Sequence, residues 1–244
     1  MQNLRFLLLQ IRDADDPIRP QEVGCFVRAI GCEEQAVIPL DLLSGFPTDA
    51  QLQKVDAVLI GGSGNYSAAG QSPWLDSTLA GFRRLVELRK PTFASCWGFQ
   101  AIARAMGGRC IHDPPHAELG TLEFQLTPAG LYDPLFGGLP DPFLGLAGHE
   151  DHVVELPPGA VLLASSPLVK HQAFRLADMP IYCTQFHPEL DLKAFLERVA
   201  QYPQYVKRIA GATLEQFARS CREAPDTPQL LRRFAQLVIA NSSS

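Results

Sequence analysis

Short apolar runs alternate with helical patterns along the first half of the chain. The helical segments, of which Pro20 to Ile30 and Pro73 to Leu88 are the clearest, carry apolar residues three and four positions apart. The runs between them are short enough to be buried strands, and they are Leu4 to Leu9, Ala36 to Pro39, Val55 to Ile60 and Thr92 to Ala94. Strands that alternate with helices predict a mostly parallel sheet covered on both faces. We expect Leu4 to Leu9 to be the first, central strand of this sheet.

From residue 109 to residue 181 the pattern changes to short strands separated by proline and glycine turns, which predicts an antiparallel extension of the sheet. The clearest of these strands are Gly120 to Leu126, Val161 to Ala164 and Gln172 to Leu176, followed by Ile181 to Phe186. Helical patterns then return at Lys193 to Val199, Thr213 to Arg222 and Pro228 to Ala240. We therefore expect an α/β domain over 1–200 and a C-terminal helical extension over 201–244 packed on it.

Cys96 lies where the predicted strand from Thr92 to Ala94 turns into a helix. A nucleophile on such a turn projects from the edge of the sheet, and the tight backbone needs small residues two positions either side. The chain has Ala94 and Gly98 there. The first N–H groups of the helix point at the sulfur, which favours the thiolate, and the amide of Trp97 is free to bind an oxyanion. The pattern predicts an exposed, reactive thiol.

A base for this thiol follows the strand that begins at Ile181. Phe186 is succeeded by His187, Pro188 and Glu189. Pro188 keeps the residue before it extended, and side chains two positions apart on an extended chain face the same way. His187 and Glu189 can therefore touch, so the carboxylate sets the tautomer and the direction of the imidazole. The sequence thus predicts a nucleophile, a base and an orienting carboxylate.

These two motifs, with the glycine turn at Gly61 and Gly62, resemble the class I glutamine amidotransferases, the Cys-His-Glu hydrolases that release ammonia from glutamine. The resemblance spans roughly residues 4 to 195. Within the family, the chain resembles the glutaminase domain of GMP synthase, here as a stand-alone protein. At the strand-to-helix turn that carries the nucleophile, called the elbow below, the family usually has the sequence Gly-x-Cys-x-Gly, and this chain has Ala94 in place of the first glycine. The family's glycine turn is usually Gly-Gly-Pro, and this chain has Ser63 in place of the proline. The Phe-His-Pro-Glu match has no such departure. The resemblance implies a flavodoxin-like fold.

The resemblance also implies a set of substrate-binding residues. Gln100 lies one helical turn past the cysteine, where the family's glutamine side chain helps to hold the substrate. His149 stands in a loop similar to the family's Ser-His-Gly-Asp loop beside the active site. Gly61 and Gly62 are expected to form, with the amide of Trp97, a cradle for the oxyanion and the substrate backbone, because a Cβ would block close approach.

Other interpretations of these loops compete with this one. A glycine turn after a strand often binds phosphate, but Ser67 stands where the dinucleotide fingerprint has a third Gly or Ala, and no Gly-Lys-Ser/Thr occurs. A plain surface turn stays open as an alternative. His149 to His152 packs two histidines and two acids together, yet adjacent ligands point in different directions and no third partner has fitting spacing. We therefore predict no metal site.

Composition narrows the class of protein further. The 244 residues are 46% hydrophobic and 19% charged, as in ordinary soluble proteins, and no apolar run approaches the ~20 residues of a membrane span. A net charge of −5 gives no electrostatic footprint for nucleic acid. The six cysteines include no C-x-x-C pair, which predicts neither zinc nor disulfides and a reducing, cytoplasmic compartment. No cofactor is expected.

The predicted function is hydrolysis of the glutamine side chain, in which Cys96 attacks the γ-carboxamide and a glutamyl thioester forms. Two fates of the ammonia stay open: a separate synthetase or acceptor protein takes it, or the protein is a free-standing hydrolase of γ-glutamyl amides or peptides. A non-catalytic regulatory or binding module of the same fold is the alternative from another class, against which the intact triad argues. A protease-like or chaperone-like relative would in general lack the pairing of His187 with Glu189.

Overall fold

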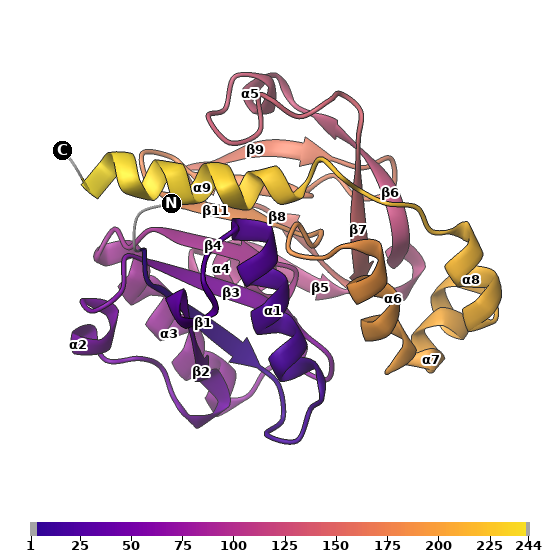
Figure 1. The fold of residues 1–244 in the computed structure, drawn as a ribbon, viewed down its shortest axis with the longest axis horizontal. Coiled ribbons are helices and arrows are strands. Elements are labelled where there is room, and N and C mark those ends of the chain that lie inside the picture. Colours follow the sequence, from indigo (N-terminus) through magenta and orange to yellow (C-terminus); the bar gives the residue numbers. More distant parts are fainter. Residues whose placement is uncertain (1–3, 243–244) are drawn as a thin grey trace.

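A nine-stranded sheet forms the centre of the computed structural model, which describes residues 4–242 (Figure 1). The strand order is β2-β1-β3-β4-β11-β10-β9-β6-β7. The first five strands of this order run parallel, namely β2 (Val37–Asp41), β1 (Phe6–Ile11), β3 (Ala57–Ser63), β4 (Thr92–Ser95) and β11 (Ile181–Thr184). The remaining four pair antiparallel, namely β10 (Ala173–Leu176), β9 (Ala160–Ser165), β6 (Glu118–Leu126) and β7 (Phe143–His149). A separate two-stranded sheet joins β5 (Arg109–His112) to β8 (Asp151–Glu155).

Helices cover both faces of the parallel part of the sheet (Figure 1). The longer helices are α1 (Ile18–Ile30), α3 (Pro73–Glu87), α4 (Trp97–Ala105), α6 (Leu192–Ala200) and α9 (Pro228–Ser242). The shorter ones are α2 (Asp49–Leu52), α5 (Pro128–Leu131), α7 (Pro203–Tyr205) and α8 (Leu214–Ser220), with single turns at Glu34–Ala36, Leu42–Ser44, Pro114–His116 and Val206–Ala210. Within the described residues 4–242, no helix is long and apolar enough to cross a bilayer.

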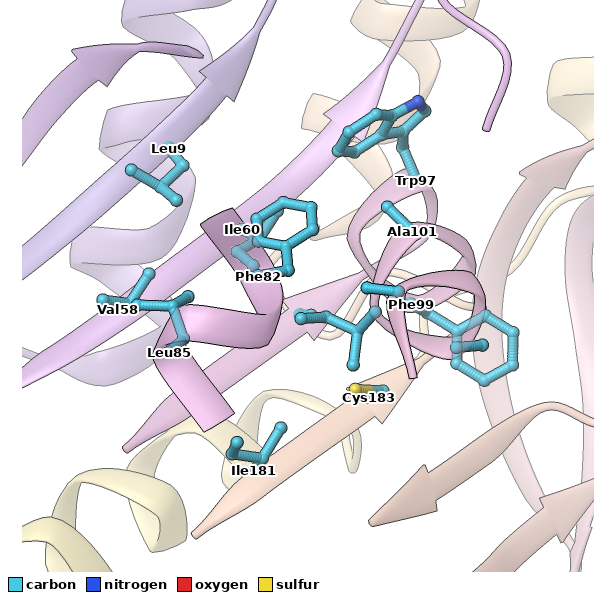
Figure 2. Close-up of a cluster of buried hydrophobic side chains, with 14 of the residues drawn as sticks. Leu9, Val58, Ile60, Phe82, Leu85, Trp97, Phe99, Ala101, Ile181 and Cys183 are labelled. Carbon is cyan, nitrogen blue, oxygen red and sulfur yellow. The ribbon is translucent and has the colours of Figure 1, made fainter. Parts of the chain in front are cut away.

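The buried strands carry apolar side chains on both faces because successive residues of a strand point to opposite sides. Val58 and Ile60 of β3 face α3 and α4, where they lie in one cluster with Phe82 and Phe99 (Figure 2). The neighbouring Leu59 belongs to the cluster on the opposite face, beneath α1 and α9. The apolar stripe of α9 joins this second cluster through Leu230, Leu231, Phe234 and Val238. The C-terminal helix is therefore part of the core of the sheet.

The predicted mostly parallel sheet, its helical cover, its antiparallel extension and the C-terminal helix are confirmed. The prediction that the first strand is central was wrong, because β1 lies next to the edge strand β2. The continuous apolar run of β1 shows that helices cover both faces of this strand. Any strand away from the edge of the sheet has such a run, so the run does not locate the strand at the centre. The strand predicted from Ile181 to Phe186 ends at Thr184, and the helix after Cys96 begins at Trp97.

Parallel pairing brings the carboxyl ends of several strands to one edge of the sheet, where such folds bind ligands. The register aligns Ser95 at the end of β4 with Thr184 at the end of β11. The N–H of Cys96 then donates to the carbonyl of Thr184 at 2.8 Å. This backbone hydrogen bond places Cys96 beside the chain that leads to His187.

Candidate active site

Cys96 occupies the turn between β4 and α4 with φ 52° and ψ −104°, a conformation that is strained for a residue with a side chain. The turn needs small neighbours, as the sequence pattern requires. A Cβ on Gly98 would lie 2.7 Å from Cγ2 of Ile60 and 3.1 Å from the Cβ of Ala94. Ala94 therefore fits at the first small position while Gly98 must stay glycine.

The sequence predicted an exposed thiol at Cys96, but the structure buries it. Only 7% of Cys96 is accessible, and the residue lies in a pocket with its Sγ 3.8 Å from the carbonyl oxygen of Gly148. The turn that carries Cys96 does project from the sheet, but three other segments surround it. They are the loop 62–67, the turn 148–151 and the segment from Leu190 to Tyr205. The pocket exists only once these distant segments pack together.

His187 and Glu189 make the contact that the spacing predicts. Nδ1 of His187 lies 2.6 Å from Oε1 of Glu189, and both side chains are buried. His187 and Cys96 line the same pocket. Burial alone would lower the pKa of His187, but the charges of Glu189 and Cys96 and the hydrogen bonds to both outweigh it and raise this pKa to about 9. The imidazolium is thus favoured at neutral pH.

Glu189 has a second cationic neighbour that the sequence did not indicate. Nη1 of Arg198, from α6, lies 3.5 Å from the Oε1 that contacts His187. Burial raises the pKa of Glu189, yet the charges of His187 and Arg198 and the hydrogen bond from His187 bring it below its usual value. The carboxylate is therefore held ionised between two cations.

The two predicted glycines of the oxyanion loop point to different places. A Cβ on Gly62 would lie 2.9 Å from Cε1 of His187 and 3.5 Å from the Cβ of Cys96, so the backbone of Gly62 lies directly against both. A Cβ on Gly61 would instead lie 2.3 Å from Oε1 of the buried Glu22. Gly62 lines the pocket and Gly61 does not. The structure thus brings only the second glycine to the thiol.

Trp97 contributes to the site through its backbone. Its indole packs into the core between Trp74 and Phe82, with ring centroids 5.9 and 6.1 Å away. As the first residue of α4, Trp97 has an N–H that no carbonyl within the helix can accept. This N–H lies one peptide unit from Cys96, and Trp97 is among the residues that line the pocket.

Gln100 and His149 both line the pocket but are held by other protein groups. Nε2 of Gln100 donates to the carbonyl of Asp151 at 2.7 Å and to Oε1 of Gln185 at 3.1 Å. The ring of His149 lies 3.0 Å from Glu118 and 3.1 Å from the carbonyl of Asp151. With both ring nitrogens occupied, His149 holds the turn between β7 and β8 in place.

Several residues that line the pocket have no recognisable signal in the sequence. Arg12, Arg198 and Tyr202 line the pocket although nothing in their local pattern separates them from other polar residues of a loop or an amphipathic helix. For Arg12 the one available signal is its position directly after the buried strand β1. In residues 4–242, no group of three or more His, Cys, Asp or Glu side chains is arranged to hold a metal ion.

Comparison with known proteins places this chain in a family. The model described as glutamine amidotransferase class-I matches residues 22–201. Gamma-glutamyl peptidase 3 of Arabidopsis thaliana is 28% identical over 212 residues, which cover 84% of this chain and 81% of that relative. One subunit of the glutamine-hydrolysing GMP synthase of Methanopyrus kandleri is 30% identical over 144 residues, which cover 59% of this chain and 71% of that relative.

The fold has a counterpart among solved structures. The crystal structure of a glutamine amidotransferase from Thermotoga maritima aligns with a TM-score of 0.76 at 18% identity. The alignment covers 98% of this chain and 99% of that chain, so the C-terminal segment lies within the shared fold. The flavodoxin-like architecture expected from the sequence is confirmed.

Proposed function

This chain belongs to the class I glutamine amidotransferase family, and we propose that it hydrolyses the γ-carboxamide of glutamine through a thioester on Cys96. The observation that carries the proposal is that Cys96 and His187 line one pocket, where both lie against Gly62, while His187 makes a 2.6 Å contact with the buried Glu189. A thiol, a protonated imidazole and a buried carboxylate in this order are the groups that acyl transfer requires.

The reaction follows from these positions. The thiolate of Cys96 attacks the γ-carbonyl carbon, and the N–H groups of Gly62 and Trp97 stabilise the negative oxygen that develops. The tetrahedral intermediate collapses as the C–N bond breaks, and His187 donates its proton to the departing ammonia. The neutral His187 then removes a proton from water, which attacks the thioester. Glutamate leaves, and the thiolate and imidazolium are restored.

A specific observation favours a second candidate in the same chemical class, hydrolysis of γ-glutamyl peptides. The match to the Arabidopsis gamma-glutamyl peptidase extends over 84% of this chain, against 59% for the GMP synthase relative. That second relative is by name one part of a larger enzyme, which supports the other proposal, that a partner protein uses the ammonia. Both candidates use the same acyl-transfer steps and differ in the amine that leaves.

A diazo-ketone analogue of glutamine tests the proposal, and we expect it to alkylate Cys96 alone. Burial raises the pKa of each of the five other thiols, to about 11 for Cys25 and about 12 for Cys110, with Cys32, Cys183 and Cys221 also raised. Few of them are thiolates at neutral pH, so their labelling should be below about a tenth of that at Cys96. Intact mass and peptide mapping report the adduct, and glutamine should protect against it. Equal labelling of Cys110 or Cys183 would contradict the proposal.

The pH dependence of kcat/KM should show an alkaline limb near pH 9. The pKa of His187 is raised to about 9, so the imidazolium that pairs with the thiolate and protonates the leaving amine persists up to that pH and is lost above it. Initial rates of glutamate release across pH about 6 to 10 measure this limb. Glu189→Gln should move the limb to lower pH, because the carboxylate charge raises this pKa. A limb at the same pH in both proteins would be inconsistent with the assignment.

A further inference from the structure

The pocket that holds Cys96 and His187 is also lined by a group of side chains that the release of ammonia does not use. They are Leu190, Phe195 and Val199, which belong to α6 and the turn before it, and Tyr202 just after α6. In Figure 1, α6 and the short α7 that follows it lie together beside this end of the sheet. The pocket therefore combines an apolar wall with the polar groups of the triad.

Arg12 and Arg198 line the same pocket with buried guanidinium groups, and each group has N–H donors without a hydrogen-bond acceptor among the described residues. Arg12 is 2% exposed and Arg198 is 7% exposed, and both line the pocket. The atoms without a hydrogen-bond partner among the described residues are Nε of Arg12 and both Nη atoms of Arg198. Tyr202 lines the same pocket, and burial raises the pKa of its hydroxyl. Buried donors without acceptors are costly, which indicates that a ligand supplies the acceptor.

The carboxylates around these cations decide what kind of acceptor fits. Arg12 contacts Asp16 at 3.2 Å and Glu22 at 3.4 Å, and the Nη1 of Arg198 lies 3.5 Å from Glu189 while its Nε donates to Gln21. The acids offset the positive charge, so the region exerts no strong field on a distant anion. They also orient the guanidinium groups. A ligand is therefore recognised through directed hydrogen bonds, for which the two Nη atoms of Arg198 match a carboxylate.

The position beside His187 identifies the part of the substrate that meets these groups. His187 protonates the nitrogen that leaves, so substituents on that nitrogen extend to the His187 side of Cys96, where Glu189 and Arg198 follow. Ammonia has no substituent to place there. An amino acid as the leaving amine has a carboxylate two bonds from the nitrogen and a side chain for the apolar wall.

We propose that Arg12, Arg198 and Tyr202, with the apolar wall of α6, form a subsite for the leaving amine, and that this subsite selects γ-glutamyl compounds whose amine is an amino acid. The inference rests on the proposed acyl-transfer function and names its substrate class. Arg198 binds the carboxylate of the leaving amino acid, and Leu190, Phe195 and Val199 contact its side chain. Glutamine is hydrolysed by the same acyl-transfer steps at Cys96, but its leaving group, ammonia, leaves this subsite unoccupied.

Two matched substrates test the subsite. γ-Glutamyl-alanine and γ-glutamyl-ethylamide differ only in the carboxylate on the leaving amine, and glutamate release reports both. We expect kcat/KM for the alanine compound to exceed that for the ethylamide by about 10- to 100-fold, the range of one or two charge-assisted hydrogen bonds. Equal values would overturn the inference.

Arg198→Lys keeps a cation beside Glu189 and removes the paired donors. In this variant the kcat/KM values for the two substrates should lie within about threefold of each other. The ratio of the two values is compared between the wild type and the variant, so the different basicity of the two leaving amines affects both ratios equally. Lys193→Ala, an exposed position on the same helix, is the control and should keep the wild-type ratio. A ratio that survives in Arg198→Lys would contradict the role of Arg198.

The design separates failure of the subsite from failure of the proposed reaction. If glutamine and both amides are hydrolysed with equal kcat/KM, the subsite is wrong and the reaction stands. If the wild-type protein hydrolyses none of the three, the reaction itself is wrong. Should Arg198→Lys not fold, calorimetry of Cys96→Ala with the two amides gives the same comparison as affinities, and equal affinities would again overturn the inference.

Discussion

Replacing Cys96 with alanine is expected to abolish glutamine hydrolysis, with kcat lower by about 10⁴ or more. No other group in the pocket can form the thioester, so the remaining rate comes only from substrate binding and the oxyanion donors. The fold should survive, because alanine removes one sulfur atom from the wall of the pocket and leaves the backbone of the turn at Cys96 unchanged. Steady-state release of glutamate and ammonia measures the effect, on protein whose folding is checked by circular dichroism.

A matched control exists elsewhere in the chain. Cys110 has the same 7% exposure as Cys96 but lies on β5 and does not line the pocket. Cys110→Ala should therefore keep kcat within a few-fold of the wild type. Near-wild-type turnover by Cys96→Ala would show that Cys96 is not the nucleophile, whatever the control does.

The second large effect is expected for Glu189→Gln, with kcat lower by roughly 10- to 10³-fold and KM changed only a few-fold. The carboxylate lies behind the imidazole, 2.6 Å from Nδ1, and Glu189 does not line the pocket. A glutamine side chain keeps the size but can present its NH₂ to Nδ1, which selects the wrong tautomer of His187. It also leaves the buried Arg198 beside a neutral group. A cysteine enzyme should lose less than a serine enzyme would, because a thiol ionises more readily.

Kinetics of glutamine hydrolysis by the wild type and the variant decide the role of Glu189. Glu197→Gln, a half-exposed acid on α6 that pairs with Lys193, controls for the loss of one negative charge near the site. An unchanged kcat in Glu189→Gln would reduce Glu189 to a structural residue and the site to a Cys96 and His187 dyad. A KM raised as strongly as kcat falls would mean instead that Glu189 contacts the substrate.

Local sequence patterns predicted most of the fold and the centre of the site. Apolar runs and helical spacing located most of the strands and the longer helices, because burial on one or two faces imposes its period on the chain. The strands β5, β7 and β8 and the short helices α2, α5 and α7 were not predicted. The elbow at Cys96 was predicted because its tight backbone excludes side chains at Gly98, and the contact of His187 with Glu189 because Pro188 holds the chain extended. Each of these depends on residues only a few positions apart.

What this sequence determined by itself is therefore the set of elements and the chemistry of its short motifs, where backbone geometry alone limits the choice of residue. Only the tertiary structure decided that the thiol of Cys96 is enclosed, that Gly61 packs on Glu22 while Gly62 meets His187, and that Arg12 and Arg198 face one pocket. Arg198 and Arg12 are far apart in the chain, and their distances to Glu189 and Glu22 depend on how α6 and the loop after β1 pack at the edge of the sheet. Such contacts follow from the pairing order of strands and the packing of helices, which place a side chain independently of the residues next to it.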